Sequence, residues 1–295
     1  MVAAGVLLVD KPGGMTSHDV VARARKALGT RKIGHAGTLD PMATGLLILG
    51  VESATRLLTF IVGLDKTYEA TIRLGATTDT DDADGRIQTT TDAATLEPAA
   101  IEAAMADLRG EISQVPSRVS AIKVAGRRAY DLVRAGEEVE LAARAVTISR
   151  FEILDSRRED GFVDLDVAVD CTSGTYIRAV ARDLGAALGV GGHLTALRRT
   201  RIGPFGVEGA ASVDELGAGP LRAPADVATA VLGAIAVSAD EAQDLRHGKR
   251  LIGAASRVDS VPAAAVDPSG ALVGVVERRG ADLKSVMNLP PEAPA

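Results

Sequence analysis

The stretch GHAGTLDPMATG, residues 34–45, places one carboxylate, Asp40, on a short irregular loop. Pro41 disfavours the helical region for the residue before it, so we expect an extended backbone at Asp40. Glycines on both sides permit sharp turns, because glycine has no Cβ. An acid presented on such a loop, five residues after His35, is typical of a reactive carboxylate. An ordinary Asx-Pro turn explains the same residues about equally well, so the rest of the chain must decide.

The composition is that of an ordinary globular protein, with 46% hydrophobic and 24% charged residues in a chain of 295. A single cysteine, Cys171, excludes an intramolecular disulfide and a multi-cysteine zinc site. Four scattered histidines give no metal-ligand spacing, so no metal is expected. The chain shows no signal peptide and no apolar run of about 18 residues. These features predict a cytoplasmic protein that does not enter membranes.

The charge is unevenly distributed along a chain whose net charge is −6. Residues 18–35, 117–134 and 176–205 each carry five lysines and arginines against one acid, whereas the stretch TDTDDADG at 78–85 is acidic. Each basic cluster alone is most simply a solvated helix face. Three arginine-rich clusters together favour contact with phosphates, and a basic face can bind a polyanion despite the net charge.

Hydrophobic periodicity predicts strands at 5–9, 46–50, 66–74, 146–154 and 162–169, and helices at 17–28, 54–60 and 98–109. Ser17 is a good N-cap for the first helix, and Gly29 is placed to end it. CTSGTYIRAVARDLG at 171–185 passes from a strand into a helix, and 193–205 reads as a turn and a basic strand. TDTDDADG lacks the closing Glu of a calcium loop, which favours a solvated turn.

Residues 111–145 contain polar turns and basic residues, which suggests an arm over a substrate. From 206 to 232 the chain is rich in Ala, Gly and Pro with little periodicity, so we place a domain boundary near residue 230. The remainder, 231–295, reads as a small β-rich module with a helix at SADEAQDL and a hairpin strand at ALVGVVERRG. We expect the last residues, NLPPEAPA, to be disordered.

Six sequence blocks resemble, in the same order, the bacterial tRNA pseudouridine-55 synthase family: KPGGMTS, GHAGTLDPMATG, DKTYEA, SAIKVAGRRAY, CTSGTYIRAVARDLG and HLTALRRTRIGPF. The match runs from about residue 5 to about residue 205. The resemblance implies an α+β catalytic domain, 1–230, with a mixed and mainly antiparallel sheet flanked by helices. The C-terminal part resembles a PUA-type RNA-binding module.

The resemblance also implies roles for individual side chains. Asp40 becomes the catalytic carboxylate, Arg178 its ion-pair partner and Tyr68 the ring that stacks on the target base. His35, Tyr176 and Leu197 become further substrate contacts. The chain departs from the family at QVPSRVSAIK, where Ser117 and Val119 stand in place of an often present proline and tyrosine. This difference affects the expected contacts of the arm rather than the chemistry.

Phosphate contacts are expected from a set of basic residues that position RNA: Lys11, Arg56, Lys123, Arg127, Arg198 and Arg199. The implied reaction isomerises one uridine of the tRNA T-arm loop and requires no cofactor, and the protein is expected to act as a monomer. Asp40 serves either as nucleophile or as base at the neighbouring 2′ carbon.

Two other functions are consistent with parts of the sequence. One is a non-catalytic RNA-binding module with the same basic surface. The other is a phosphate-binding enzyme that uses KPGGMTS, although this stretch lacks the spacing of a phosphate-binding loop.

Overall fold

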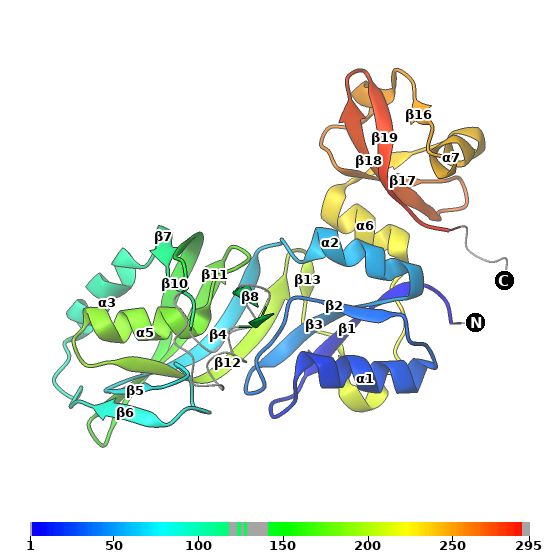
Figure 1. Ribbon diagram of the computed structural model, residues 1–295. Helices are drawn as coiled ribbons and strands as arrows, with labels where there is room; N and C mark the ends of the chain where they lie inside the picture. Colours follow the sequence, from blue (N-terminus) through cyan, green and yellow to red (C-terminus); the bar gives the residue numbers. More distant parts are fainter. Residues whose placement is uncertain (1, 118–122, 125–126, 129–140, 291–295) are drawn as a thin grey trace. The chain divides into compact units, whose positions relative to one another are not determined.

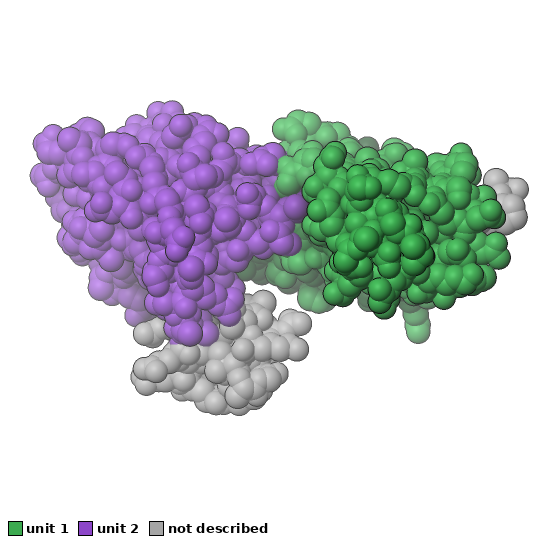
Figure 2. All heavy atoms as spheres, turned by 90° about the horizontal axis from the view of Figure 1, so that it is seen from above, with its two compact units in different colours: residues 1–41, 45–62, 203–295 green, residues 42–44, 63–202 purple. Residues whose placement is uncertain are grey.

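The computed structural model describes residues 2–117, 123–124, 127–128 and 141–290. The chain divides into two compact units, which Figure 2 shows in different colours. Unit 1 comprises residues 1–41, 45–62 and 203–295, and unit 2 comprises residues 42–44 and 63–202. Throughout the described residues, every helix is too short or too polar to reach across a bilayer.

The N-terminal part of unit 1 contains a group of paired strands with helix α1 (Ser17–Leu28) against them (Figure 1). Strand β1 (Gly5–Lys11) lies between β14 (Ala211–Ser212), parallel to it, and β3 (Thr44–Val51), antiparallel to it. β2 (Ile33–Ala36) also pairs with β3. Around these lie short elements: η1 (Glu52–Leu57), α2 (Leu58–Ile61), β13 (Phe205–Gly206) and η2 (Val213–Glu215).

Helix α1 is amphipathic as its sequence predicts. Val20, Val21 and Ala24 are buried in one core cluster with alternate residues of β1 and β3, which are Leu7, Val9, Leu47, Leu49 and Val51. Gly29 ends the helix in the left-handed conformation at φ 65°, as expected.

The N-cap of α1 differs from the prediction. Thr16, not Ser17, caps the helix: its hydroxyl accepts a hydrogen bond from the Asp19 N–H at 3.1 Å, and the Asp19 carboxylate accepts one from the Thr16 N–H at 2.9 Å. This capping box requires an acid three residues after the cap, and only Thr16 satisfies that spacing with Asp19. Ser17 is thereby released for another contact.

The C-terminal part of unit 1 is a second sheet in the order β15-β17-β18-β19-β16. These strands span Ala234–Ala236, Ala263–Val266, Leu272–Arg279, Asp282–Asn288 and Arg250–Leu251, and they enclose their own core with α7 (Ala239–Arg246) and η3 (Ala254–Arg257). The predicted helix at SADEAQDL and the predicted hairpin strand are both confirmed. The segment 206–232 was wrongly expected to lack periodic structure, because it contains helix α6 (Pro224–Leu232), which begins at a proline.

Unit 2 is built on an antiparallel sheet in the order β12-β4-β11-β10-β7. The strands are Gly192–Ile202, Lys66–Leu74, Phe162–Cys171, Arg144–Glu159 and Gly110–Gln114. Helix α5 (Ile177–Ala187) packs on β12 and on α3 (Pro98–Asp107). Two short hairpins complete the described residues of the unit: β5 (Ala76–Thr78) with β6 (Ile87–Thr90), and β8 (Lys123–Val124) with β9 (Arg127–Arg128).

The predicted α+β class with a mixed, mainly antiparallel sheet and a small C-terminal β-sheet is confirmed. Strand β4 has the predicted bounds, 66–74, and its burial alternates as its sequence alternates. α5 buries Ile177, Val180, Ala181 and Leu184, also as predicted.

Gly185 of α5 provides a test of this packing. A Cβ at this position would overlap the backbone of Gly191 and Gly192, which cannot move aside as a side chain can. We expect Gly185→Ala to lower the free energy of unfolding in urea by about 2 kcal/mol or more. Gly63→Ala is the matched control, since nothing lies within 4 Å of its Cβ position. Equal stability of the two variants would show that α5 does not approach β12 this closely.

Candidate active site

The expected site residues fall in both units. Asp40 and His35 belong to unit 1, whereas Tyr68, Tyr176, Arg178 and Leu197 belong to unit 2. Each half is built from local contacts that can be followed separately. The pairing of Asp40 with Arg178 stays a prediction.

Asp40 sits between two residues whose main-chain groups are bonded to other segments of unit 1. The Ser17 hydroxyl donates to the Leu39 carbonyl at 3.2 Å and accepts from the Leu39 N–H at 2.9 Å. On the other side, the Pro41 carbonyl accepts from the Gly14 N–H at 2.9 Å and from Lys11 Nζ at 3.3 Å. The carboxylate is therefore carried on a loop that is fixed immediately before and after it.

The segment KPGGMTS has a structural role in this arrangement. Lys11 is fully buried, and its ammonium also donates to the carbonyls of Pro12 and Met15 at 2.9 and 2.7 Å. This burial argues against the phosphate contact that was expected of Lys11. The same contacts argue against a phosphate-binding loop, because the lysine points into the protein.

The two glycines that flank the Asp40 loop adopt positive φ, Gly37 directly after β2 and Gly45 near the start of β3. Gly37 and Gly45 have φ values of 83° and 99°, in the region that favours glycine. His35 lies on β2 and is partly exposed, and its ring meets that of His18 edge to face, with the centroids 5.4 Å apart.

In unit 2, Tyr68 and Leu197 share a buried face of the sheet. Tyr68 of β4 stands opposite Val169 of β11 and Arg199 of β12, and Leu197 stands opposite Ala70, two residues along β4. Directly opposite residues on neighbouring strands present their side chains on one face. The structure thus brings together two of the expected substrate contacts.

Arg198 and Arg199 do not act as a pair. Successive strand residues face opposite sides, so Arg199 shares the face of Tyr68 and is 1% exposed, whereas Arg198 is partly exposed and lines a hollow of about 550 Å³ with Thr44, Glu69 and Leu154 among others. The burial of Arg199 argues against the backbone contact expected of it, whereas the partly exposed Arg198 stays a candidate for one.

Arg178 lies in a buried polar cluster at the start of α5. Its guanidinium donates to the Thr80 carbonyl at 2.9 Å and lies 3.4 Å from the Asp82 carboxylate, and both side chains are less than a tenth exposed. Asp82 is oriented in turn by the Thr80 hydroxyl at 2.5 Å and the Asp84 N–H at 3.2 Å.

The prediction that TDTDDADG is only a solvated turn is therefore wrong for Asp82. A buried guanidinium requires a carboxylate or several carbonyls, and this loop supplies both. A signal was present in the sequence, since alternating Thr and Asp before a glycine favour side-chain bonds to nearby backbone.

Tyr176 is held through its main chain. The Gln114 side-chain amide accepts from the Tyr176 N–H at 2.8 Å and donates to its carbonyl at 3.2 Å, and Gln114 is 1% exposed. Sequence reasoning missed Gln114 because a single amide at the end of a strand carries no pattern.

Lys66 is a buried cation on the face of Tyr68, two residues before it. Its ammonium donates to the Leu64 carbonyl at 2.6 Å. Burial, with a smaller contribution from the nearby Arg199, lowers the pKa of Lys66 to about 8. Burial also raises the pKa of the facing Cys171 thiol to about 11.

The other basic residues expected to contact the RNA backbone lie on α2-flanking and arm segments of the chain. Arg56 is exposed and donates to the Asn288 carbonyl at 2.5 Å. Lys123 and Arg127 lie on the paired strands β8 and β9. Most of the basic arm, including Arg118 and Val119, lies outside the described residues, whereas Ser117 at its foot is fully buried.

Comparisons with known families cover almost the whole chain. The model described as "TruB family pseudouridylate synthase (N terminal domain)" matches residues 25–177. Models described as "tRNA pseudouridylate synthase B C-terminal domain" and "tRNA Pseudouridine synthase II, C terminal" match residues 178–235 and 232–290.

Curated relatives named tRNA pseudouridine synthase B are similar over most of their length. The protein from Leifsonia xyli subsp. xyli is 55% identical over 98% of both chains. That from Mycolicibacterium paratuberculosis is 55% identical over 97% of this chain and 98% of its own. The protein from Nocardia farcinica is 62% identical over 84% of this chain and 81% of its own.

Solved structures support the fold. A chain of a Cbf5-Nop10-Gar1 complex matches 99% of this chain and 85% of its own length, with a TM-score of 0.70 and 24% identity. A chain of an H/ACA RNP bound to a substrate RNA matches with a TM-score of 0.69 and 24% identity, covering 97% of this chain and 85% of its own.

Because Asp82 is buried against Arg178 and Asp84 is exposed, we expect substitutions of these two acids to change the stability of the protein by different amounts. Asp82→Asn removes the negative charge that lies 3.4 Å from the buried guanidinium of Arg178, so we expect the free energy of unfolding to fall by about 3 kcal/mol. The exposed Asp84→Asn is the control and should change it by less than about 0.5 kcal/mol. Urea unfolding measures both, and similar values would contradict the pairing.

The lowered pKa of Lys66 should make the free energy of unfolding depend on pH. Because its pKa is lowered to about 8 in the folded protein, the unfolded chain binds more protons between about pH 8 and the ordinary lysine value, and stability rises with pH there. Lys66→Met lacks this contribution. From about pH 7.5 to about pH 10, the unfolding free energy of the wild type should gain roughly 2 kcal/mol on that of the variant. If the unfolding free energies of the wild type and the variant changed with pH in parallel, the pKa of Lys66 would not be lowered by burial.

Proposed function

The chain belongs to the TruB family of pseudouridylate synthases and is an isomerase, and from this premise we propose that it converts uridine 55 in the T-arm loop of tRNA to pseudouridine. The relatives that are 55% identical over nearly the whole chain are named as tRNA enzymes, which supports tRNA as the substrate. The observation that carries the proposal is the loop of Asp40, fixed through the main chain of Leu39 and Pro41.

The reaction breaks the N1–C1′ bond of the uridine, turns the base and rejoins it to the ribose through C5. The C5 proton is released, N1 gains one, and nothing is oxidised or reduced. In the proposed mechanism the ionised carboxylate of Asp40 acts at the ribose. It either attacks C1′ as a nucleophile or removes a proton from the neighbouring 2′ carbon.

Arg178 is proposed to keep Asp40 ionised. A carboxylate that leaves water tends to gain a proton, and a nearby guanidinium opposes this by favouring the charged form. Within unit 2, Arg178 is already held by Thr80 and Asp82, so its guanidinium is presented in a defined position.

Access of Asp40 to the ribose requires the target base to leave its stack, which costs a few kcal/mol. Stacking on an aromatic ring returns about 1–3 kcal/mol, and Tyr68 is proposed to supply it. Leu197, on the same face of the sheet, packs beside the extruded nucleoside, with Tyr176 and His35 as further contacts. The exposed Arg56, the partly exposed Arg198 and the arm residues Lys123 and Arg127 are proposed to hold phosphates.

The variant Asp40→Asn tests the catalytic assignment. Asparagine keeps the size of the side chain and removes its negative charge, so release of tritium from C5-labelled uridine in tRNA should fall more than about a thousandfold. Retention of tRNA on a filter should stay within about twofold of the wild type. Asp84→Asn serves as the control. Conversion at the wild-type rate by Asp40→Asn would refute the assignment, and a wild type that binds tRNA without converting it would favour a binding module.

A further inference from the structure

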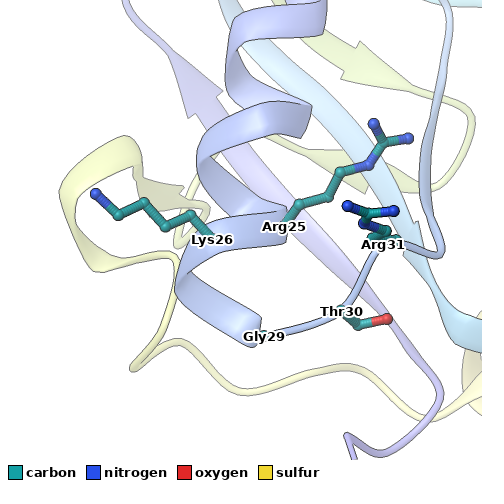
Figure 3. A pocket seen from close by; sticks show the side chains of 5 residues that line it. All are labelled: Arg25, Lys26, Gly29, Thr30 and Arg31. Carbon is teal, nitrogen blue, oxygen red and sulfur yellow. The ribbon is translucent and has the colours of Figure 1, made fainter.

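The C-terminal end of α1 and the residues after it form a hollow of about 560 Å³ in unit 1. It is lined by Arg25, Lys26, Gly29, Thr30 and Arg31. Figure 3 shows Arg25 extending from the helix and Arg31 from the following loop, whereas Lys26 points to the other side of the helix. Both arginines belong to the basic cluster 18–35, but neither is among the individual residues that the sequence analysis names as phosphate contacts.

These cations lack an acidic partner. Within the part of the chain that the structure describes, no carboxylate oxygen lies within 4.0 Å of Arg25, Lys26 or Arg31. Glu52 contacts the residues after α1, but through other side chains: its carboxylate accepts a hydrogen bond from the Thr30 hydroxyl and forms an ion pair with Lys32 at 3.4 Å. Two arginines thus line one hollow with no carboxylate of the described residues within salt-bridge distance, an arrangement that a bound anion would stabilise.

Stabilisation of the helix dipole explains only part of this cluster. Arg25 and Lys26 lie in the last turn of α1, where cations are favourable. Arg31 lies beyond the cap at Gly29, outside the helix. Arg25 is fixed by donating to the Ile33 carbonyl at 2.9 Å, so its guanidinium has a defined place in the lining of the hollow.

The hollow is connected to the loop of Asp40 by α1 and β2. Ser17, in the first turn of α1, bonds to Leu39, and the last turn carries Arg25. Twelve helical residues span about 18 Å, so the hollow lies roughly that far along the helix from the loop. His18 and Arg25, seven residues apart on one face, contact His35 and Ile33 of β2, so helix and strand run side by side between the two places.

We propose that Arg25 and Arg31 bind a backbone phosphate in the stem of the substrate RNA, beyond the loop that holds the target uridine. Guanidinium groups match phosphate oxygens in geometry and charge, and a contact one helix length from Asp40 falls on the helical part of a stem-loop rather than on its loop. The contact orients the stem without reading its sequence. The identity of the ligand as RNA rests on the proposed function, whereas a free phosphate ion would offer the same chemistry.

Binding of two T-arm hairpins tests the site, one with the full stem and one whose stem is cut to the base pairs next to the loop. Arg31→Gln should weaken binding of the full hairpin about fivefold and reduce the slope of its affinity against salt by about one. Its effect on the short hairpin should be less than twofold. Arg23→Gln is the matched control, because Arg23 is on the same helix, is exposed and lies 3.9 Å from Asp214.

Three outcomes would overturn the site. Equal losses for Arg31→Gln and Arg23→Gln would reflect net charge alone, and equal losses for both hairpins would place the contact at the loop. The third outcome combines two measurements. If calorimetry shows that the wild type binds inorganic phosphate and that Arg31→Gln does not, while the variant binds both hairpins with unchanged affinity, the hollow binds a free anion rather than RNA. Failure of the proposed function is a separate result, seen as no conversion of either hairpin by the wild type.

Discussion

The buried ammonium of Lys11 is the contact on which the Asp40 loop depends. Burying a cation costs several kcal/mol unless its donors are satisfied. Here the carbonyls of Pro12, Met15 and Pro41 accept all three N–H bonds, so one side chain joins the end of β1, the following turn and the loop. Ser17 holds the other side of Asp40 through Leu39. The position of the Asp40 carboxylate is therefore set by the main-chain groups of Leu39 and Pro41. An irregular loop can hold a side chain in a defined position when its main chain is hydrogen-bonded in this way.

Three basic side chains of unit 2, Lys66, Arg178 and Arg199, are buried. Lys66 and Arg199 lie on the face of the sheet that carries Tyr68, and Arg178 lies at the start of α5. Cations are seldom buried unless they are paired, and the pKa of Lys66 is lowered by burial first and by Arg199 second. Asp82 compensates Arg178.

The regular elements could be predicted because their patterns are local. Alternation gave β4 its bounds, and the period of Val20, Val21 and Ala24 gave α1 its buried face. The sequence also singled out Asp40 and Tyr68 as functional candidates, and their roles remain proposals. Burial of polar groups could not be predicted. Lys11, Asp82 and Arg199 read as surface charges, because only tertiary contacts across many residues show which charges find partners inside. Helix α6 escaped notice because small residues give a weak amphipathic signal.

Several polar residues that the sequence did not single out, such as Gln114 and Asp81, form hydrogen bonds or ion pairs with residues at the start of α5 or within it. Gln114, the last residue of β7, bonds both main-chain groups of Tyr176, and the carbonyl of the next residue, Val115, accepts from Arg182 at 2.7 Å. Arg182 also lies 3.3 Å from Asp81, the neighbour of Asp82. One short helix thus holds the foot of the basic arm and the acidic loop, and carries Arg178. The positions of Tyr176, Arg178 and Arg182 are thus set by two segments outside α5, the end of β7 and the acidic loop, because these supply partners for polar groups that the helix itself leaves unsatisfied.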